Sequence, residues 1–182
     1  MTLLILGVLL WAFSHLMKRI TPGFRARLGD GRGKGVAALL SLAAVGLMIY
    51  GYGQADVVEL WNPPAYLTPV NNLLMVVAVV LVSLGYNRGR LRGLMRHPML
   101  TAVKLWAVAH LLVKGDLASV ILFGGLLAWA VADVIAINRM EPNWTRPAPG
   151  PLVNDAIYLG LSGVLLWVIV DIHTWLGYFP FG

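Results

Sequence analysis

The chain has 182 residues, of which 59% are hydrophobic and 12% are charged, and its mean hydropathy of +0.77 excludes a soluble domain of this size and predicts an integral membrane protein. The net charge of +6 does not indicate a nucleic-acid partner, because the basic residues lie beside apolar segments; contacts to the lipid bilayer and its anionic headgroups account for them. The absence of cysteine excludes disulfides, thiolate metal sites, a cysteine nucleophile and covalent haem attachment.

Six apolar runs follow one another, each near the ~20 residues that cross a ~30 Å hydrocarbon core. The first run is followed by its basic residues, the reverse of a cleavable signal peptide, so we expect it to be retained. The fourth run is the shortest, and a tilted or half-buried helix is an alternative to a regular span there. The sequence predicts an all-α, six-transmembrane-helix bundle that forms one domain over residues 1–182. The predicted spans are 2–18, 36–52, 70–86, 98–113, 117–138 and 155–176.

The loops between these runs predict the orientation, because Lys and Arg accumulate on the cytoplasmic side. The loop at 53–69 carries Asp56 and Glu59 with no Lys or Arg, and the short loop after the fourth run has only Lys114 beside Asp116. Both termini are therefore predicted to be periplasmic. The basic residues of the remaining loops are Lys18, Arg19, Arg25, Arg27, Arg32, Lys34, Arg88, Arg90, Arg92, Arg96, Arg139 and Arg146.

The fourth run concentrates polar residues that are costly in lipid unless they face protein, water or a ligand. His97 and His110 are thirteen residues apart, so a regular helix places them on different faces, ~20 Å apart along its axis, and they cannot share one iron. Lys104 lies on nearly the same face as His97. Its depth matches that of Asp133 in the fifth run, which predicts an ion pair inside the bundle. The alternative is that Lys104 extends to the cytoplasmic interface.

The remaining histidines lie nearer the ends of their runs. His15 is near the cytoplasmic end of the first run and His173 is at the outer end of the last run. Each histidine has an ordinary interpretation as a hydrogen-bonded side chain at the interface. His110 lies deeper, between Ala109 and Leu111, so a functional interpretation is favoured most strongly there.

Several segments together resemble one family of membrane proteins, the NnrU family, over essentially the whole chain. Family members are bacterial inner-membrane proteins linked to denitrification, through the expression of nitrite and nitric oxide reductases. The resemblance implies an inner-membrane location and denitrification proteins as partners. The segments that carry it are Ser14-His15-Leu16, Arg96-His97-Pro98, Leu105-Trp-Ala-Val-Ala-His110-Leu-Leu, Asp116-Leu-Ala-Ser-Val-Ile-Leu-Phe-Gly-Gly125 and His173-Thr-Trp-Leu-Gly.

The resemblance also implies a cofactor, since a plant relative, zeta-carotene isomerase, is a haem b enzyme with histidine axial ligands. Those histidines match His15 and His110 by motif, so the resemblance implies a noncovalent haem b with these two metal ligands. Two histidines on one haem have Cα atoms on the order of 12 Å apart, given metal–nitrogen bonds of ~2 Å. By helical rise, His15 and His110 differ in depth by roughly 10 Å, so the pairing needs tilted spans. His97 matches the depth of His15 better and is the substitute ligand.

The predicted cofactor-binding residues are therefore His15, His110, His97, Arg96 and Lys104. The protein departs from the plant enzyme in the fifth run, where Trp129 and Asp133 lie in the region of a histidine pair, so isomerase activity is a weak inference. Redox chemistry, a response to nitric oxide and isomerisation of a small hydrophobic ligand remain open.

Two further functions stay open. Arg96-His97-Pro98 at the start of an apolar helix also looks like the S-adenosylmethionine motif of membrane isoprenylcysteine-type methyltransferases. Those enzymes add acidic and asparagine contacts after the next span, where this chain has Asn138, Glu141 and Asn143. The other alternative is an assembly factor without a cofactor, acting on the denitrification reductases.

Overall fold

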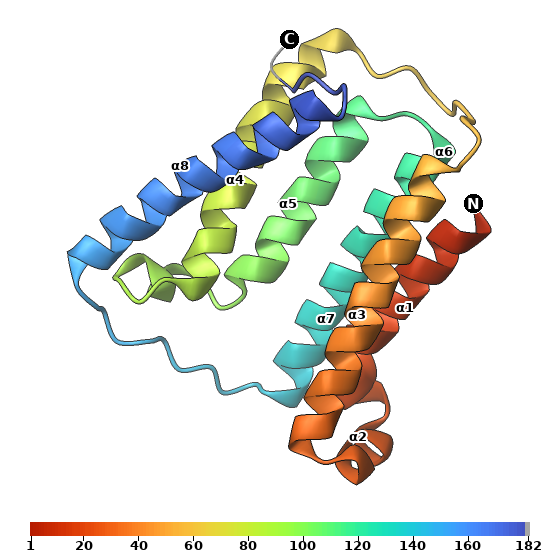
Figure 1. Cartoon of the computed structure of the whole chain (residues 1–182). Helices are drawn as coiled ribbons and strands as arrows, with labels where there is room; N and C mark the ends of the chain where they lie inside the picture. Colours follow the sequence, from red (N-terminus) through yellow and green to blue (C-terminus); the bar gives the residue numbers. More distant parts are fainter. Residues whose placement is uncertain (181–182) are drawn as a thin grey trace.

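The computed structural model describes residues 1–180, the side chain of Arg25 apart, and the predicted domain of 1–182 extends two residues beyond them. The described part is helical, and its only strand-like feature is an isolated bridge between Glu59 and Asp116 (Figure 1). The helices are α1 (Thr2–Ile20), α2 (Pro22–Leu28), α3 (Asp30–Gly53), η1 (Ala65–Leu67), α4 (Thr68–Tyr86), η2 (Leu91–Leu94), α5 (Pro98–Val113), α6 (Leu117–Ser119), η3 (Val120–Gly124), α7 (Gly125–Met140) and α8 (Leu152–Trp175).

Five of these segments are long and apolar enough to cross a membrane, which confirms the all-helical, multi-pass prediction. The fourth predicted span is α5, which has 16 residues. At ~1.5 Å per residue it is about 24 Å long, shorter than a ~30 Å hydrocarbon core. The sixth span therefore remains a prediction, which requires α5 to cross the membrane. The five long segments are α1, α3, Ala65–Tyr86, Leu117–Met140 and α8.

The predicted loop between the first two spans, residues 19–35, is more helical than its composition predicts, because it contains α2 and the first turns of α3. Asp30 and Lys34 form an i,i+4 ion pair of 2.8 Å within the first turns of α3, which begins six residues before the apolar run. Prolines start several helices, because a missing N–H costs nothing in the first turn; Pro98 begins α5 in this way. The chain between α7 and α8 carries four prolines and is not helical.

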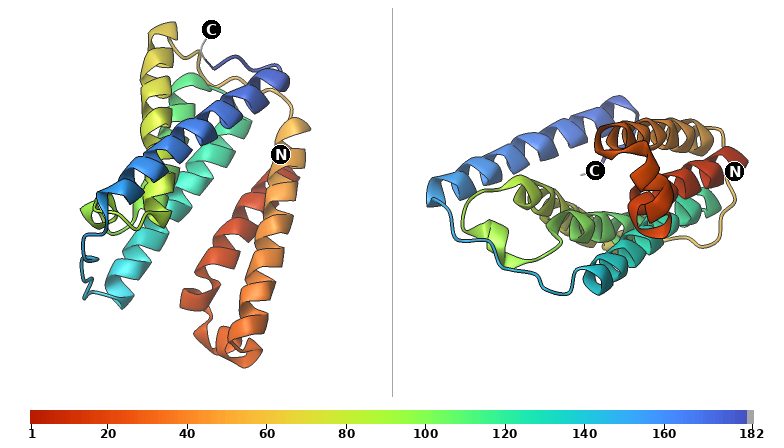
Figure 2. Two further views of the ribbon diagram at one scale, coloured as in Figure 1. Left: turned by 60° about the vertical axis from the view of Figure 1, so that its left-hand side comes forward. Right: turned by 90° about the horizontal axis from the view of Figure 1, so that it is seen from below.

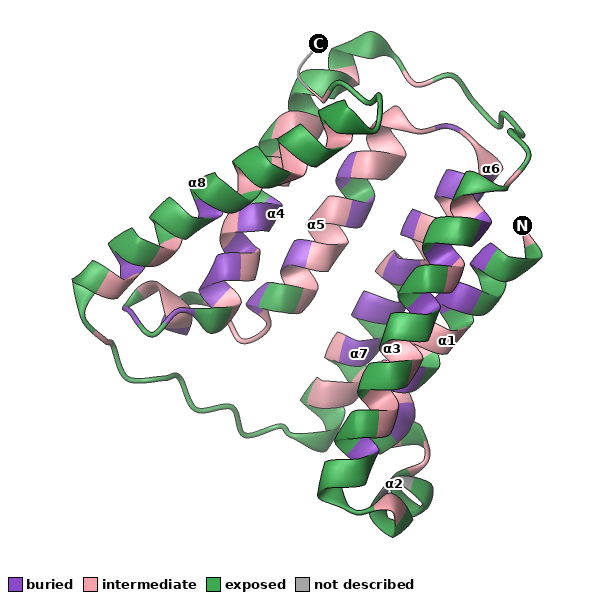
Figure 3. Ribbon diagram, in the orientation of Figure 1, coloured by how far each residue is buried: buried purple, intermediate pink, exposed green. Residues whose placement is uncertain are grey.

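Two groups of helices make up the bundle (Figures 1 and 2). The α1–α3 hairpin packs against α7 around a core that includes Leu4, Met48 and Trp129. The α4–α5 pair packs around Leu81 and Ala102, and α5 also contacts α7. Helix α8 packs mainly against α4 and is exposed along most of its length (Figure 3). The start of α1 and the end of α8 lie at the same end of the bundle, opposite the loops that carry most of the basic residues.

Helix α8 is fixed at its first turn by Asp155, a buried carboxylate. Its oxygens accept hydrogen bonds from Asn87 Nδ2 at 2.7 Å, from Arg90 N at 3.0 Å and from Leu91 N at 3.1 Å. Hydrogen bonds to an ionised acceptor are stronger than those between neutral groups. This carboxylate therefore ties the start of α8 to the chain that follows α4.

Helices α1 and α3 approach closely because glycines lie at their interface, as is common in membrane helix pairs. A Cβ added at Gly7 would lie 2.8 Å from Met48 Cγ and 2.9 Å from Met48 N. A Cβ added at Gly51 would overlap the backbone of Leu3 and Leu4. Backbone atoms cannot move aside as a flexible side chain does, so Gly51 sets the separation of the hairpin.

Gly51→Val should therefore force α1 and α3 apart and destabilise the protein by about 1–3 kcal/mol, the usual cost of overpacking. The matched control is Gly46→Val in the same helix, where a Cβ meets nothing within 4 Å. Thermal unfolding in detergent should show a clear drop for Gly51→Val and little change for Gly46→Val. Equal melting temperatures for the two variants would contradict the close approach.

Candidate functional site

A cavity lies beside His110, among α4, α5, η3, α8 and the chain after α8. Its volume is about 540 Å³, within the ~300–1,000 Å³ range of ligand pockets. A second cavity of about 320 Å³ shares Met75, Trp106, Ile169 and His173 with it and extends along α4 and α5. The combined lining is mostly apolar, and the polar groups of the larger cavity include His110, His173, Asn71 and Lys114.

The ring of His110 is held in one orientation. Its Nδ1 lies 2.8 Å from the carbonyl oxygen of Trp106, one turn earlier in α5. A carbonyl only accepts, so Nδ1 carries a proton, and in the neutral imidazole Nε2 keeps its lone pair. Phe123 stacks on the ring with centroids 4.5 Å apart, and Trp106 lies 5.2 Å away. This arrangement is the one that metal-binding histidines use, in which a backbone carbonyl fixes the tautomer.

Phe123 reaches His110 from a π-helical turn, η3, which interrupts the long helix of residues 117–140. Such π turns inside α-helices occur frequently at functional sites. The same segment also carries Trp129, six residues further along. Residues 117–140 therefore supply an aromatic neighbour to each of the two predicted metal ligands.

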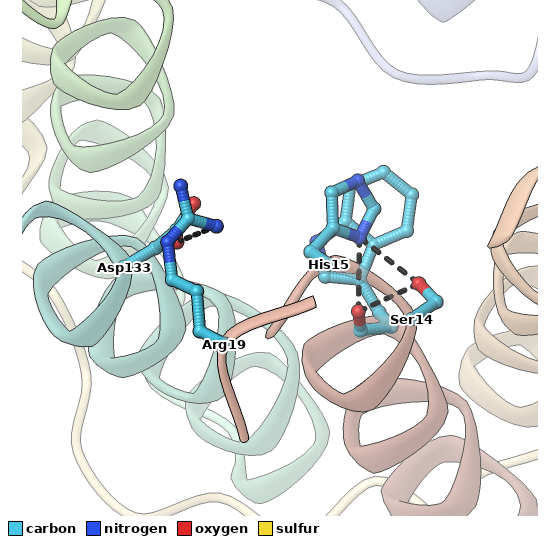
Figure 4. Close-up of polar contacts among 5 residues, drawn as sticks. Ser14, His15, Arg19 and Asp133 are labelled. Carbon is cyan, nitrogen blue, oxygen red and sulfur yellow. Dashed lines mark hydrogen bonds and ion pairs between the residues drawn. The ribbon is translucent and has the colours of Figure 1, made fainter. Parts of the chain in front are cut away.

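His15 lies in a separate cluster where α1 packs against α7. Its Nδ1 is 2.9 Å from the carbonyl oxygen of Trp11 and 3.0 Å from Ser14 Oγ (Figure 4). The rings of Trp11 and Trp129 lie 4.1 Å and 4.9 Å from the His15 ring. Its Nε2 therefore also keeps a lone pair. However, His15 does not line either cavity, and the structure does not bring it to His110.

The two histidine clusters share a sequence signal that the motif analysis missed. Leu10-Trp-Ala-Phe-Ser-His15-Leu and Leu105-Trp-Ala-Val-Ala-His110-Leu repeat the pattern Leu-Trp-Ala-x-x-His-Leu. The spacing of four places the tryptophan and the histidine one turn apart on the same helix face. In both copies the histidine Nδ1 bonds to the carbonyl of that tryptophan. The repeat therefore specifies the local geometry of both rings.

The predicted ion pair between Lys104 and Asp133 is wrong. Asp133 pairs instead with Arg19 at the end of α1, at a distance of 3.0 Å between Nη1 and Oδ1 (Figure 4). Helix α1 packs on α7, so Arg19 reaches Asp133 directly, whereas α5 turns Leu100, Val103 and Trp106 toward that core. Lys104 is half-buried and forms no ion pair with any residue that the structure describes.

Arg96 and His97 join the start of α5 to the end of α7. His97 Nε2 lies 2.9 Å from Asn138 Oδ1, and the Arg96 guanidinium donates to the carbonyl oxygen of Glu141. Because Nε2 of His97 donates to an oxygen, it differs from His15 and His110, whose Nδ1 atoms donate. These contacts bring the Arg96-His97-Pro98 motif next to the segment 138–143, and the methyltransferase interpretation requires both.

Among known protein families, the family model described as NnrU protein matches residues 3–180 of the chain. The chain belongs to the NnrU family. No curated protein and no solved structure matches it. The resemblance noted in the sequence is therefore confirmed over nearly the whole chain, and the histidine clusters described above are features of an NnrU-family membrane protein.

Within the described residues of this NnrU-family chain, no three His, Cys, Asp or Glu side chains converge as a metal site. A haem takes four iron ligands from its porphyrin, so one or two protein histidines complete it. The cavity residues suit such a group: His110 and His173 offer nitrogen lone pairs, Trp106 and Phe123 offer flat apolar walls, and Lys114 offers a positive charge for a carboxylate.

A polar network adjoins the cavity at Tyr52, which lines it. Tyr52 Oη lies 2.9 Å from Ser119 Oγ, and Asp116 accepts from Ser119 Oγ at 2.6 Å and from Ser119 N at 2.8 Å. Burial by itself would raise the pKa of Asp116, but the hydrogen bonds from Ser119 and the charge of Lys114 together hold it below its ordinary value. The ionised carboxylate therefore caps the helix of residues 117–140 and ties it to α3.

This lowered pKa predicts a pH dependence. The stabilisation by Asp116 is fully present above its ordinary pKa of about 4 and is lost as the pH falls through the lower value of the folded state. Asp116→Asn should lower the melting temperature in detergent at pH 7, and the difference from wild type should shrink as the pH falls below about 4. A difference that is constant between pH 7 and pH 3 would contradict the assignment.

Proposed function

We propose that this NnrU-family protein is a six-span protein of the bacterial inner membrane, with both termini periplasmic, that binds haem b through His110. The observation that carries the proposal is the His110 ring, whose Nδ1 is occupied by the Trp106 carbonyl and which lines a cavity of about 540 Å³. A neutral imidazole with its Nε2 lone pair free is the form that binds iron. The family resemblance supports the same cofactor.

The residues around the cavity would each contribute to holding the group. His110 would ligate the iron, Trp106 and Phe123 would exclude water from the porphyrin faces, and Lys114 would pair with a propionate. A bound haem b supplies one-electron chemistry and reversible binding of nitric oxide. The role we propose is redox or nitric oxide-responsive, in support of the expression or maturation of nitrite and nitric oxide reductases.

Nitric oxide binding tests this role. The dithionite-reduced, detergent-purified protein should give a saturable change in its haem absorption spectrum when titrated with nitric oxide or carbon monoxide. In a denitrifying host that lacks its own copy, the wild-type chain should restore nitrite reductase activity and His110→Ala should not. Restoration by His110→Ala would contradict a haem-based role and favour an assembly factor without a cofactor.

A second candidate function rests on the contacts between α5 and α7. Arg96 and His97 meet Glu141 and Asn138, the segments that an S-adenosylmethionine site would combine. Isothermal titration of the purified protein with S-adenosylmethionine distinguishes the two functions. Binding that is lost in Arg96→Ala and kept in His110→Ala would favour the methyltransferase.

A further inference from the structure

We propose that His173 is the second axial ligand of the group held by His110, an inference that rests on the haem function proposed above. Both histidines line the cavity of about 540 Å³ between α5 and α8. The Nδ1 of His173 lies 2.7 Å from the carbonyl oxygen of Ile169, one turn earlier in α8. In the neutral form of the His173 ring the lone pair is therefore on Nε2, as in that of His110.

The depths of the two histidines match. His110 is in the last turn of α5, which ends at Val113, and His173 is in the last turn of α8, which ends at Trp175. Both helices run toward the same end of the bundle (Figure 1). The pairing therefore needs no difference in depth, whereas His15 and His110 are separated by roughly 10 Å of helical rise.

The other histidines are less suited to this position. His15 lines neither cavity and is enclosed by Trp11 and Trp129. His97 uses Nε2 to bond to Asn138 at the opposite end of α5. His173 is therefore the histidine that we assign as the second axial ligand, opposite His110.

Helix α8 gives the pairing a mechanical consequence. The helix is tied by Asp155 at its first turn, packs mainly against α4, and is largely exposed elsewhere. The chain after α8 is already held to α4 by the hydrogen bond from Asn72 Nδ2 to the carbonyl oxygen of Pro180. A group coordinated by both His110 and His173 would add a direct link between the last turn of α8 and α5. Loading of the cavity should therefore protect the last turns of α8 from hydrogen exchange.

The test compares the haem of three purified proteins by absorption and electron paramagnetic resonance spectroscopy. The wild type should show a six-coordinate, low-spin ferric haem, in which nitric oxide or carbon monoxide must displace His173 to bind the reduced iron. His173→Ala should shift it to high spin, and added imidazole should restore the low-spin signal. The matched control, His15→Ala, should keep the wild-type spectrum. A low-spin haem in His173→Ala without imidazole, together with its loss in His15→Ala, would overturn the assignment in favour of His15.

Two further readouts keep the test decisive. His173→Met should retain a six-coordinate haem with a raised reduction potential, because a thioether ligand favours the reduced iron. Slower hydrogen exchange in residues 169–175 should appear in haem-loaded wild type and be absent in His173→Ala. A wild-type protein without haem would overturn both this inference and the proposed function, whereas wild-type haem that is unaffected by His173 substitutions would overturn this inference alone.

Discussion

Replacing His110 with alanine should abolish haem retention and leave the protein in the membrane. The side chain is half-buried in the last turn of α5, and its ring packs against both Phe123 and Trp106, which also contact each other. Under the proposed function, its removal would take away an iron–nitrogen bond that no other α5 side chain can replace, because Lys104 and His97 lie further toward the opposite end of the helix. The haem-to-protein ratio of the purified variant should fall to less than about a tenth of the wild-type value.

His97→Ala is the matched control, because it removes a histidine from the same segment but from outside the cavity. Its haem content should equal that of the wild type if His110 is the ligand. If instead His97→Ala loses haem and His110→Ala retains it, the depth-matched pairing of His15 with His97 is correct and the cavity is not the site.

Breaking the ion pair between Arg19 and Asp133 should produce the largest loss of stability. The two side chains are only 20% and 10% exposed, so Asp133→Leu leaves the Arg19 charge with little solvent. Removing one partner of a buried pair typically costs about 3–5 kcal/mol, because the remaining charge is uncompensated. The free energy of unfolding, measured by detergent-induced denaturation in mixed micelles, should fall by an amount of that order.

Two controls separate this effect from the loss of a side chain. The double variant Arg19→Leu with Asp133→Leu should recover most of the stability, since apolar side chains replace a buried pair at little cost. Lys34→Ala breaks the ion pair to Asp30, whose side chains are 73% and 80% exposed, and should change the stability by no more than about 0.5 kcal/mol. A double variant as unstable as Asp133→Leu would show that the pair does not account for the loss.

Hydropathy predicted the helices well because a bilayer imposes both length and composition on every span. The boundaries depend on local chemistry and were less well predicted. Residues 30–35 were expected in the loop before the second predicted span, which was placed at 36–52, yet they form the first turns of α3, supported by the Asp30–Lys34 pair. Helix α5 ends at Val113, as expected from the apolar run, and its 16 residues explain why it falls short of a full span.

Side-chain partners were predicted less well, because they depend on which helices pack together. Asp133 was correctly expected to have a basic partner, but depth alone could not distinguish Lys104 from Arg19. The tautomers of His15 and His110 follow from tryptophans one turn earlier, so the repeated motif carried that information. The position of His173 across the cavity follows from how α8 crosses α4, which no local motif specifies.

The most direct test of the haem assignment is a pyridine haemochrome assay on the detergent-purified protein from haem-replete cells, with oxidised and dithionite-reduced absorption spectra. The account predicts about one b-type haem per chain. A protein that folds in the membrane and contains no haem under these conditions would contradict it, and would leave the methyltransferase and the assembly factor as the functions to pursue.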